Sequence, residues 1–451
     1  MNPRHSKRVY AEGVYIVSLG CPKNLVDSEV MAGCLITSGI PVNMDKNSAE
    51  YYLINTCAFL PRARSECESA IADGIRWKKR APQVRKLIVA GCLIQQDKEN
   101  LIRSKYPEVD AWSGVDGVDK IFDTFRKAGN GYTAGDAAEP TYLYNENSPR
   151  ILFTLPHVAY LKISDGCNNR CAYCSIPNIR GALRSRSIDS VLTEARNLIA
   201  GGVSEIILIA QDVTAYGSDL ADGTTLAKLL HEMDKLEGDF VIRLLYTHPA
   251  HYTEEFFAEY AANKHLLPYL DIPLQHISDD ILLKMGRKTT RERIEYILNK
   301  IRTLRSDSTI RTTFITGLPG ESDKEFAELE EFVKAQKFSR LGVFSYSPEP
   351  GTPAAERTDR VSTEIAEKRA ERIMQLQEKI ALENNQAMIG KVITVICDEA
   401  DGRNGVGRSF ADAPEIDNLV YFSGKTRLRQ GMKYQVRINR AKTFDLYGEV
   451  C

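Results

Sequence analysis

The stretch DGCNNRCAYC, residues 165–174, decides how the chain is organised. It places Cys167, Cys171 and Cys174 at the spacing C-x3-C-x2-C, with Tyr173 directly before the last cysteine. Three thiolates this close suit a four-iron cluster, which needs four ligands, so one iron would stay open to a substrate or cofactor. Ferredoxin clusters, which only carry electrons, supply the fourth thiolate. The alternatives are three structural thiols or zinc, but zinc favours a fourth ligand at short spacing, and none follows before His231.

Length and composition limit the possible classes of protein. A chain of 451 residues is too long for one ordinary core, so two or three domains are expected. The formal net charge of −1 gives no global field that would attract nucleic acid. Ten cysteines behind a polar N-terminus without a signal peptide indicate reduced thiols and metal rather than disulfides. No apolar run is long enough to cross a bilayer, so we expect a cytoplasmic protein without membrane contact.

One theme occurs three times in residues 1–128. An apolar run ends in a cysteine in YIVSLGC (15–21), YYLINTC (51–57) and KLIVAGC (86–92). Each run predicts a buried strand followed by a helix, and this alternation predicts a parallel sheet. Cys21, Cys57 and Cys92, each one residue past its strand, would then meet at the carboxyl edge and hold a second cluster. Three separate core thiols are the alternative. Cys34 and Cys67 fall inside predicted helices and are taken as structural.

Residues 129–150, rich in Gly, Asn, Pro and acidic residues, predict a linker. Residues 151–388 alternate short apolar runs with amphipathic segments and end in a long polar helix, 362–388, that would connect to the next domain. The repeated strand–helix unit predicts a full or partial (β/α) barrel of the TIM type. Polar strand ends would line its carboxyl-terminal mouth, beside the cysteine loop.

The tail, residues 389–451, has short alternating strands with Gly and Asp turns, which predict a small antiparallel β-barrel of the OB-like kind. Its first half is acidic (CDEAD, ADAPEID) and its second half basic (KTRLRQ, RINRAK). This separation does not resemble a plain phosphate-binding groove, and the acidic edge would suit a basic protein partner. Ordinary solubilising charge is the alternative.

C-x3-C-x-aromatic-C is the signature of the radical S-adenosylmethionine (SAM) superfamily, which this chain resembles. The resemblance implies a 4Fe–4S cluster at Cys167, Cys171 and Cys174 whose open iron binds SAM, with Tyr173 beside the adenine. One electron then cleaves SAM to a 5′-deoxyadenosyl radical. The cofactor carries this chemistry, and the protein supplies position and a shielded cavity.

Several strand ends resemble SAM contacts of that superfamily. Gln211 and Asp212 stand where the methionyl amino group binds, and Gln275 would face the ribose and carboxylate. Gly317 and Gly320, in GLPGE, would let the backbone approach SAM closely. For each of these residues, a polar strand end that simply meets water is the alternative.

Three arginines follow the cysteine motif in NIRGALRSRS. Arg180, Arg184 and Arg186 could clamp a carboxylate. A solvated basic loop is the alternative for any one of them.

The whole chain resembles the radical-SAM methylthiotransferases, which join a three-cysteine domain, a radical-SAM barrel and a C-terminal TRAM β-barrel. SLGCPKNLVDSE, INTCAFL, DGCNNRCAYCSIPNIRG and GRSFADAPEIDN are similar to the branch that modifies an aspartate of a ribosomal protein. Ser187 stands where members often have proline, which affects only the local loop.

This resemblance implies that a methylthio group is placed on the β-carbon of an aspartate in small-subunit ribosomal protein twelve. It implies two 4Fe–4S clusters and SAM, a basic ribosomal protein held by the TRAM domain, and an electron donor of the flavodoxin or ferredoxin type. That carbon bears no acidic proton, so abstraction of a hydrogen atom meets the need.

Two other functions are weighed against this one. A methylthiotransferase acting on an adenosine in transfer RNA shares the architecture, but the near-zero net charge and the acidic half of the tail disfavour it. A non-catalytic iron–sulfur RNA-binding or assembly factor would not need the glycine-rich strand ends that suit SAM.

Overall fold

The computed structural model describes residues 13–58, 60–128, 132–134 and 139–451. Contacts divide the chain into two compact units. The first contains the residues up to Phe153 with Ser164–Asn168 and Ser175–Arg186, and the second contains Thr154–Ile163, Asn169–Cys174 and Ser187–Cys451. No described helix is long and apolar enough to span a membrane.

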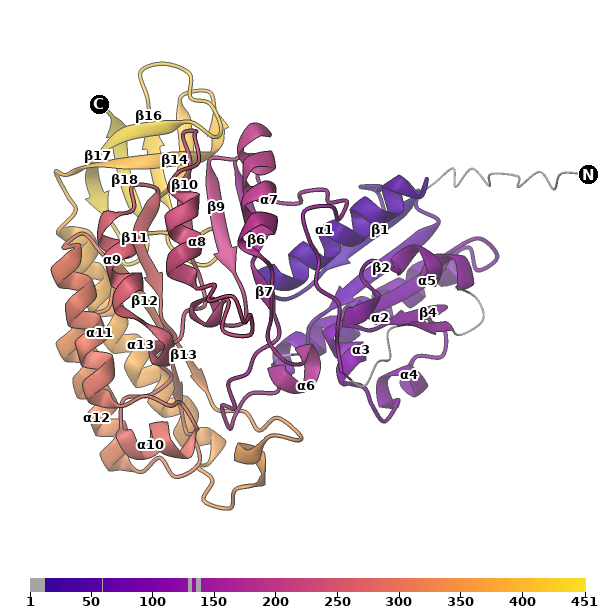
Figure 1. Cartoon of the computed structure of the whole chain (residues 1–451), viewed down its shortest axis with the longest axis horizontal. Helices are drawn as coiled ribbons and strands as arrows, with labels where there is room; N and C mark the ends of the chain where they lie inside the picture. Colours follow the sequence, from indigo (N-terminus) through magenta and orange to yellow (C-terminus); the bar gives the residue numbers. More distant parts are fainter. Residues whose placement is uncertain (1–12, 59, 129–131, 135–138) are drawn as a thin grey trace, which may run out of the picture. The chain divides into compact units, whose positions relative to one another are not determined.

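The first unit contains a five-stranded parallel sheet in the order of the chain (Figure 1). Its strands are β1 (Val14–Ser18), β2 (Tyr51–Thr56), β3 (Lys86–Gly91), β4 (Ala111–Ser113) and β5 (Tyr132–Ala134). Its helices are α1 (Pro22–Thr37), α2 (Pro61–Lys79), α3 (Cys92–Gln96), α4 (Leu101–Lys105), α5 (Ile121–Lys127) and α6 (Ile176–Arg180), with a 3-10 turn η1 (Val115–Gly117). Every residue of β2 is buried, as expected for an inner strand of a parallel sheet. This burial accounts for the apolar run Tyr51–Ile54 in its sequence.

The stretch predicted as a linker is partly built into this unit. Strand β5 pairs with β4, and further along the Asp116 carboxylate accepts from the backbone N–H groups of Thr141 and Tyr142 at 2.8 Å. Arg150 then pairs with Glu29 of α1 at 2.6 Å. The described residues of this stretch, 132–134 and 139–150, therefore pack on the first unit, and its glycines lie outside the described residues.

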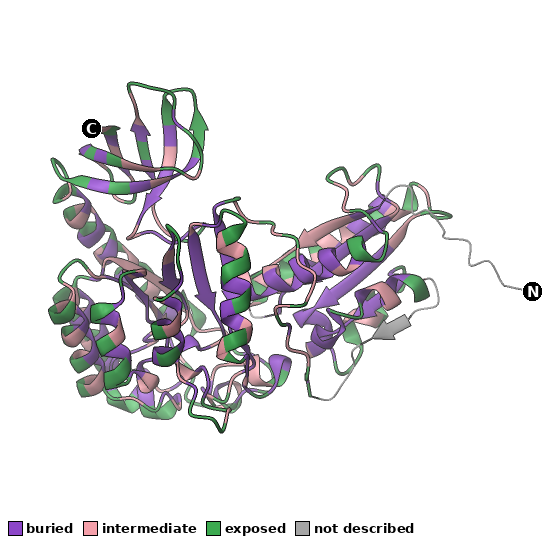
Figure 2. Cartoon of the chain, turned by 45° about the horizontal axis from the view of Figure 1, so that its top comes forward, coloured by how far each residue is buried: buried purple, intermediate pink, exposed green. Residues whose placement is uncertain are grey.

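The second unit contains a six-stranded parallel sheet in the order β13-β12-β11-β10-β9-β6. These strands are β6 (Val158–Lys162), β9 (Glu205–Ile209), β10 (Val241–Leu244), β11 (Leu266–Asp271), β12 (Thr309–Thr316) and β13 (Arg340–Ser345). The helices are α7 (Ile188–Ala200), α8 (Leu226–Met233), α9 (Glu254–Ala262), α10 (Asp279–Lys284), α11 (Arg291–Leu304), α12 (Asp323–Gln336) and α13 (Thr363–Gln386). The helices turn exposed faces outward while the strands are mostly buried (Figure 2). The sheet is open, which confirms the partial barrel.

The chain ends in a closed five-stranded barrel, which confirms the predicted small β-barrel. Its strands are β14 (Val392–Asp401), β15 (Asn404–Ser409), β16 (Val420–Ser423), β17 (Lys433–Ala441) and β18 (Leu446–Val450). All neighbouring pairs are antiparallel except β16 and β18. Val395, Cys397, Val436 and Ile438 lie in its core, which accounts for the alternating pattern of these strands.

Buried ion pairs fix the terminal barrel to the amino-terminal edge of the six-stranded sheet. Glu205, the first residue of β9, accepts from Arg243 of β10 and Arg408 of β15, both at 2.7 Å. Arg408 also donates to Asp398 at 2.6 Å, and Asp398 accepts from His157 at 2.8 Å. The terminal barrel therefore lies opposite the carboxyl-terminal mouth of the partial barrel (Figure 1).

This network depends on pH. Burial alone would raise the pKa of Glu205, but the charges of Arg243 and Arg408 outweigh burial and lower it. Burial likewise opposes the hydrogen bonds from His157 and Arg408, which lower the pKa of Asp398. A carboxyl whose pKa is lowered by folding stabilises the fold above its unfolded pKa, and this stabilisation is lost as pH falls through the lowered value.

Substitution of Glu205 should strongly destabilise the second unit. Glu205→Gln leaves Arg243 and Arg408 without their shared carboxylate, and we expect the free energy of unfolding to fall by about 3–5 kcal/mol. Urea denaturation at neutral pH measures this change. The matched control is Glu364→Gln, which removes an exposed carboxylate that pairs with Lys368 on α13 and should change stability little. Equal small losses in both variants would contradict the prediction.

Candidate active site

The carboxyl edge of the parallel sheet in the first unit carries Cys21, Cys57 and Cys92. Cys57 directly follows β2 and Cys92 directly follows β3. The expected place of Cys21, one residue past its strand, is wrong, because β1 already ends at Ser18. Gly20 turns the chain there with a φ of +94°, and a Cβ on it would lie 2.8 Å from the Cys57 sulfur. The glycine therefore allows the Cys21 segment to approach Cys57 closely.

The thiols of Cys21, Cys57 and Cys92 influence one another. Burial raises the pKa of Cys92 to about 12; the charge of Arg180 opposes this shift, and Cys21 and Cys57 add to it. The Cys92 thiol therefore keeps its proton until a metal displaces it. Among the described residues, these sulfurs do not come within 4.8 Å of one another as a group, whereas zinc bonds of about 2.3 Å would place them roughly 4 Å apart. Three thiols are the donor type that iron–sulfur clusters take.

Two further side chains hold this edge together: Asn24, which the sequence analysis did not single out, and Cys67, which it took as structural. Asn24 of α1 donates to the carbonyl of Leu19 at 2.7 Å and to that of Thr56 at 3.2 Å. The sulfur of Cys67, on α2, accepts from the Cys57 N–H at 3.2 Å. Cys34 and Cys67 lie within α1 and α2, as predicted. Cys67 therefore supports the backbone of a candidate ligand.

Cys167 belongs to the first unit, with the segment that follows the motif. Its N–H donates to the carbonyl of Gly181 at 3.1 Å. The preceding Gly166 has a φ of +77°, and a Cβ on it would lie 2.0 Å from the carbonyl oxygen of Ala182. Only glycine fits this position, which explains the Asp-Gly-Cys start of the motif.

Cys171 and Cys174 lie on a tight loop of the second unit, and the Cys174 N–H donates to the Cys171 carbonyl at 3.0 Å. Between them, Ala172 donates its N–H to Met285 at 2.9 Å and accepts from Ala354 at 2.9 Å. Met285 is the C-cap of α10, the helix after β11, and Ala354 lies after β13. Asn169 of the loop also donates to Asp212, which lies just after β9, so the loop lies at the carboxyl-terminal mouth of the sheet. Active sites of such barrels lie at this mouth.

A buried arginine faces this loop. Arg287 donates through Nη1 to the sulfur of Cys171 at 3.5 Å and through Nη2 to the carbonyl of Pro273 at 2.5 Å. Neighbouring Tyr173 packs against Ile281, Met285 and the rest of a small apolar cluster. Burial raises the pKa of Tyr173 well above its usual value, so its phenol stays neutral. A role of Tyr173 beside adenine stays a prediction.

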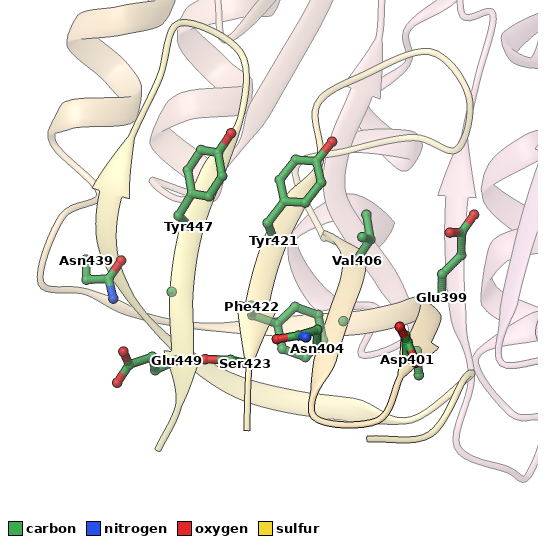
Figure 3. Close-up of a pocket in the computed structure, with 13 residues that line it drawn as sticks. Glu399, Asp401, Asn404, Val406, Tyr421, Phe422, Ser423, Asn439, Tyr447 and Glu449 are labelled. Atoms are coloured by element: carbon green, nitrogen blue, oxygen red, sulfur yellow. The ribbon is translucent and has the colours of Figure 1, made fainter. Parts of the chain in front are cut away.

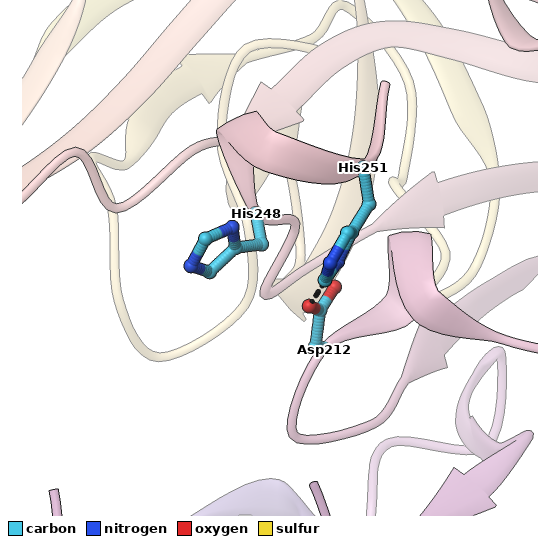
Figure 4. Close-up of side chains that lie close together, drawn as sticks. All are labelled: Asp212, His248 and His251. Carbon is cyan, nitrogen blue, oxygen red and sulfur yellow. Dashed lines mark hydrogen bonds and ion pairs between the residues drawn. The ribbon is translucent and has the colours of Figure 1, made fainter. Parts of the chain in front are cut away.

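Asp212 is anchored at the same mouth, directly after Gln211 and three residues beyond the end of β9 (Figure 4). Its carboxylate accepts from Asn169 of the cysteine loop at 2.7 Å, from His251 Nδ1 at 2.7 Å and from Thr214 at 2.6 Å. Burial alone would raise the pKa of Asp212, but the hydrogen bonds from His251 and Thr214 lower it. Asp212 therefore connects the cysteine loop to two other strand ends.

The sequence interpretation did not single out His248 and His251, although YTHPAH begins two residues past the end of β10. With Asp212 they bring three possible metal ligand atoms within 4.8 Å. A hydrogen-bonded pair fits better than a metal site, because His251 already binds Asp212 directly and His248 Nδ1 accepts from the N–H of Ala250. Burial and the charge of Arg287 lower the pKa of His248 to about 2, so His248 is neutral.

Gln275 has the geometry of a residue held ready for a ligand. It follows β11 with a φ of +72°, which is costly for a residue other than glycine. Its side-chain oxygen is buried without a hydrogen-bond partner among the described residues. Tyr246, after β10, also has a positive φ, of 64°. Strained residues cluster at functional sites, so this mouth fits a polar cofactor such as SAM.

The glycines of GLPGE have a packing role in the structure. A Cβ on Gly317 would lie 2.2 Å from that of Ala366 in α13, and one on Gly320 would lie 2.8 Å from the Asp359 carboxylate. Both have positive φ values, 75° and 82°. Their approach to SAM stays a prediction, and the close contact with α13 already requires a glycine at Gly317.

The three arginines after the motif are not a solvated loop. Arg180 and Arg186 are buried, and Arg186 lies over the ring of Tyr144 at 4.5 Å. Arg184 donates to the carbonyls of Arg180 and Ala182 at 3.0 and 2.8 Å. The alternative of a solvated basic loop is therefore wrong for Arg180 and Arg186.

Family comparisons agree with this arrangement. Residues 161–333 match the radical SAM superfamily, residues 13–114 match a family described as uncharacterized (UPF0004), and residues 389–451 match the TRAM domain. The solved structure of TsrM, a radical SAM methyltransferase from Kitasatospora setae, has a similar fold: TM-score 0.56 at 16% identity, covering 76% of this chain and 75% of that one. Fold and cysteine motif together define a radical-SAM enzyme.

Relatives narrow the class further. The ribosomal protein uS12 methylthiotransferase RimO of Desulforamulus reducens is 42% identical over 439 residues, which cover 96% of this chain and 98% of that protein. The protein of the same name from Acetivibrio thermocellus is 42% identical over 449 residues, with 97% and 98% coverage. This chain belongs to the RimO family of radical-SAM methylthiotransferases. SAM and 4Fe–4S clusters are the cofactors of this class.

Proposed function

We propose that this enzyme places a methylthio group on the β-carbon of an aspartate in ribosomal protein uS12. The observation that carries the proposal is the 42% identity over nearly the whole chain to proteins named for uS12 methylthiolation. The chemistry agrees, because a carbon without an acidic proton is functionalised by hydrogen-atom abstraction rather than by a general base.

Each set of cysteines has a separate task in this proposal. Cys167, Cys171 and Cys174 would hold the cluster that binds SAM, and Cys21, Cys57 and Cys92 would hold the cluster that carries the sulfur. When bound, these groups supply the radical and the sulfur, respectively. The surrounding residues would position SAM. Asn169 and His251 orient Asp212, and Gln275 presents a buried hydrogen-bond acceptor for a polar part of SAM.

An assay with purified, anaerobically reconstituted enzyme tests the function. Enzyme, SAM and reductant are offered uS12 or transfer RNA, and the products are digested and weighed by mass spectrometry. We expect one aspartate of uS12 to exchange hydrogen for a methylthio group. Methylthiolated adenosine without modified aspartate would favour the transfer RNA reaction. If SAM is not cleaved to 5′-deoxyadenosine and methionine, the non-catalytic alternative gains support.

The terminal barrel offers a docking groove for a basic protein (Figure 3). Tyr421 and Tyr447 stack there with ring centroids 5.2 Å apart, and Arg440 lies 4.0 Å from the Tyr447 centroid. The exposed carboxylates of Glu399, Asp401 and Glu449 line the same groove. We infer that this groove holds uS12, because carboxylates pair with lysine and arginine and aromatic rings pack against guanidinium groups.

Neutralising the groove should weaken binding of uS12. We expect Glu399→Gln, Asp401→Asn and Glu449→Gln together to raise the Kd or KM for uS12 about tenfold at low salt, and less at high salt, because screening already weakens rim charges. Titration at two salt concentrations measures this effect. The control neutralises three exposed carboxylates of α13, Glu367, Glu371 and Glu378, and should leave the KM unchanged. Equal losses in both triple variants would count against the groove.

Reductive cleavage of SAM needs one electron from outside the chain. We propose a donor of the flavodoxin or ferredoxin type and a cytoplasmic location, where the ten free thiols would stay reduced. Turnover with a reduced flavodoxin in place of a chemical reductant tests the donor.

A further inference from the structure

Arg180 is a buried charge beside the cysteines of the first unit. It ends α6, six residues after Cys174 in the chain, and is 3% exposed. Nη1 donates to Asp27 at 2.7 Å and to Asp165 at 3.2 Å. Nη2 donates to Asn24 at 3.1 Å and to the sulfur of Cys92 at 3.2 Å. One guanidinium thus joins two carboxylates, an amide and a candidate cluster ligand.

Two carboxylates alone would explain why a buried guanidinium is tolerated. They do not explain why the other half of the fork faces Asn24 and Cys92. Asn24 is the residue that binds the carbonyls of Leu19 and Thr56, which lie next to the Cys21 and Cys57 segments. Arg180 therefore contacts one candidate ligand directly and is linked through Asn24 to the backbone beside the other two.

We propose that Arg180 is a positioning residue that sets the reduction potential of the cluster held by Cys21, Cys57 and Cys92, through its hydrogen bond to the Cys92 sulfur. Hydrogen bonds to cluster sulfurs and nearby net charge are two of the features that set such potentials. A reduced cluster carries one more negative charge, so an N–H donor and a positive charge favour the reduced form. Arg180 thereby makes this cluster easier to reduce.

The set of Cys167, Cys171 and Cys174 has a similar arginine contact. Arg287, also buried, donates to Cys171 at 3.5 Å. Each cysteine set thus has its own arginine on one sulfur. Because the two arginines contact different sets, each serves as the control for the other.

The test measures the midpoint potential of one cluster at a time. In full-length protein carrying Cys167, Cys171 and Cys174 as alanine, only the cluster at Cys21, Cys57 and Cys92 should remain. An anaerobic redox titration followed by electron paramagnetic resonance gives its midpoint potential. We expect Arg180→Gln to lower the ratio of reduced to oxidised cluster at the parent's midpoint at least tenfold, which is about 59 mV for one electron. Arg180→Lys, which keeps the charge without the fork, should give a smaller shift.

A second variant tests the direction of the shift in midpoint potential. It also keeps the proposal testable if the Arg180→Gln variant binds no iron. Asp27→Asn removes a negative charge next to Arg180, so the midpoint should rise. Arg287→Gln in the same background should leave it unchanged. Arg180 is only an ion-pair partner if the Arg180→Gln variant binds the full amount of iron and its midpoint potential equals that of the parent. The same conclusion follows if Asp27→Asn leaves the midpoint potential unchanged.

The inference rests on the proposed cluster at Cys21, Cys57 and Cys92, and the two can fail separately. A background variant that binds no iron would overturn both. A normal iron content, with midpoint potentials that do not change in the Arg180 and Asp27 variants, would overturn only the role of Arg180.

Discussion

Replacing Cys167, Cys171 and Cys174 with alanine should abolish SAM cleavage and leave roughly half of the iron. SAM has no open iron to bind without this motif, whereas Cys21, Cys57 and Cys92 would still hold a cluster of the same size. Chromatography of 5′-deoxyadenosine and iron and sulfide determination on anaerobically reconstituted protein measure both quantities.

The control for this variant is Cys451→Ala, because Cys451 is exposed at the end of the described chain and should matter for neither quantity. Complete loss of iron in the triple variant would mean that the chain holds a single cluster. Undiminished iron would mean that the motif holds none.

The complementary variant, with Cys21, Cys57 and Cys92 as alanine, should separate the two halves of the reaction. We expect about half of the iron again, with SAM cleavage retained and formation of methylthio-aspartate lost, because the cofactor at the other set still generates the radical. Mass spectrometry of uS12 alongside the nucleoside assay measures the difference. Methylthiolation that persists in this variant would contradict the assignment of sulfur delivery to these cysteines.

Much of the fold could be predicted from the sequence because its local signals agree. Apolar runs of β2 and β3 end directly at Cys57 and Cys92, and β6, β9 and β11 of the six-stranded sheet are mostly apolar and buried, as strands of parallel sheets are. The alternating strands of the tail likewise predicted a small barrel. These elements follow from periodicity and turn residues, which are properties of neighbouring residues.

The site was harder to predict from the sequence where its contacts join segments that are distant along the chain. Arg180 binds Cys92, 88 residues away, and a loop rich in arginine looks solvated until the fold buries it. The offset of Cys21 comes from the backbone turn at Gly20, and β5 pairs inside a stretch whose composition is that of a linker. Asp212 was singled out as a strand-end residue, but its bond to His251 depends on the path of the chain after β10.

The position of the terminal barrel has a consequence for the size of the substrate. The ion pairs of Glu205 and Arg408 hold it at the end where the strands begin, while Cys171 and Cys174 lie where they finish. An eight-residue strand such as β12 separates these ends by roughly 26 Å. A partner gripped by Tyr421 and Tyr447 must span that distance to present its aspartate. Whole uS12 should therefore be a better substrate than a short peptide copied from around the modified residue, and the shortfall should appear in KM.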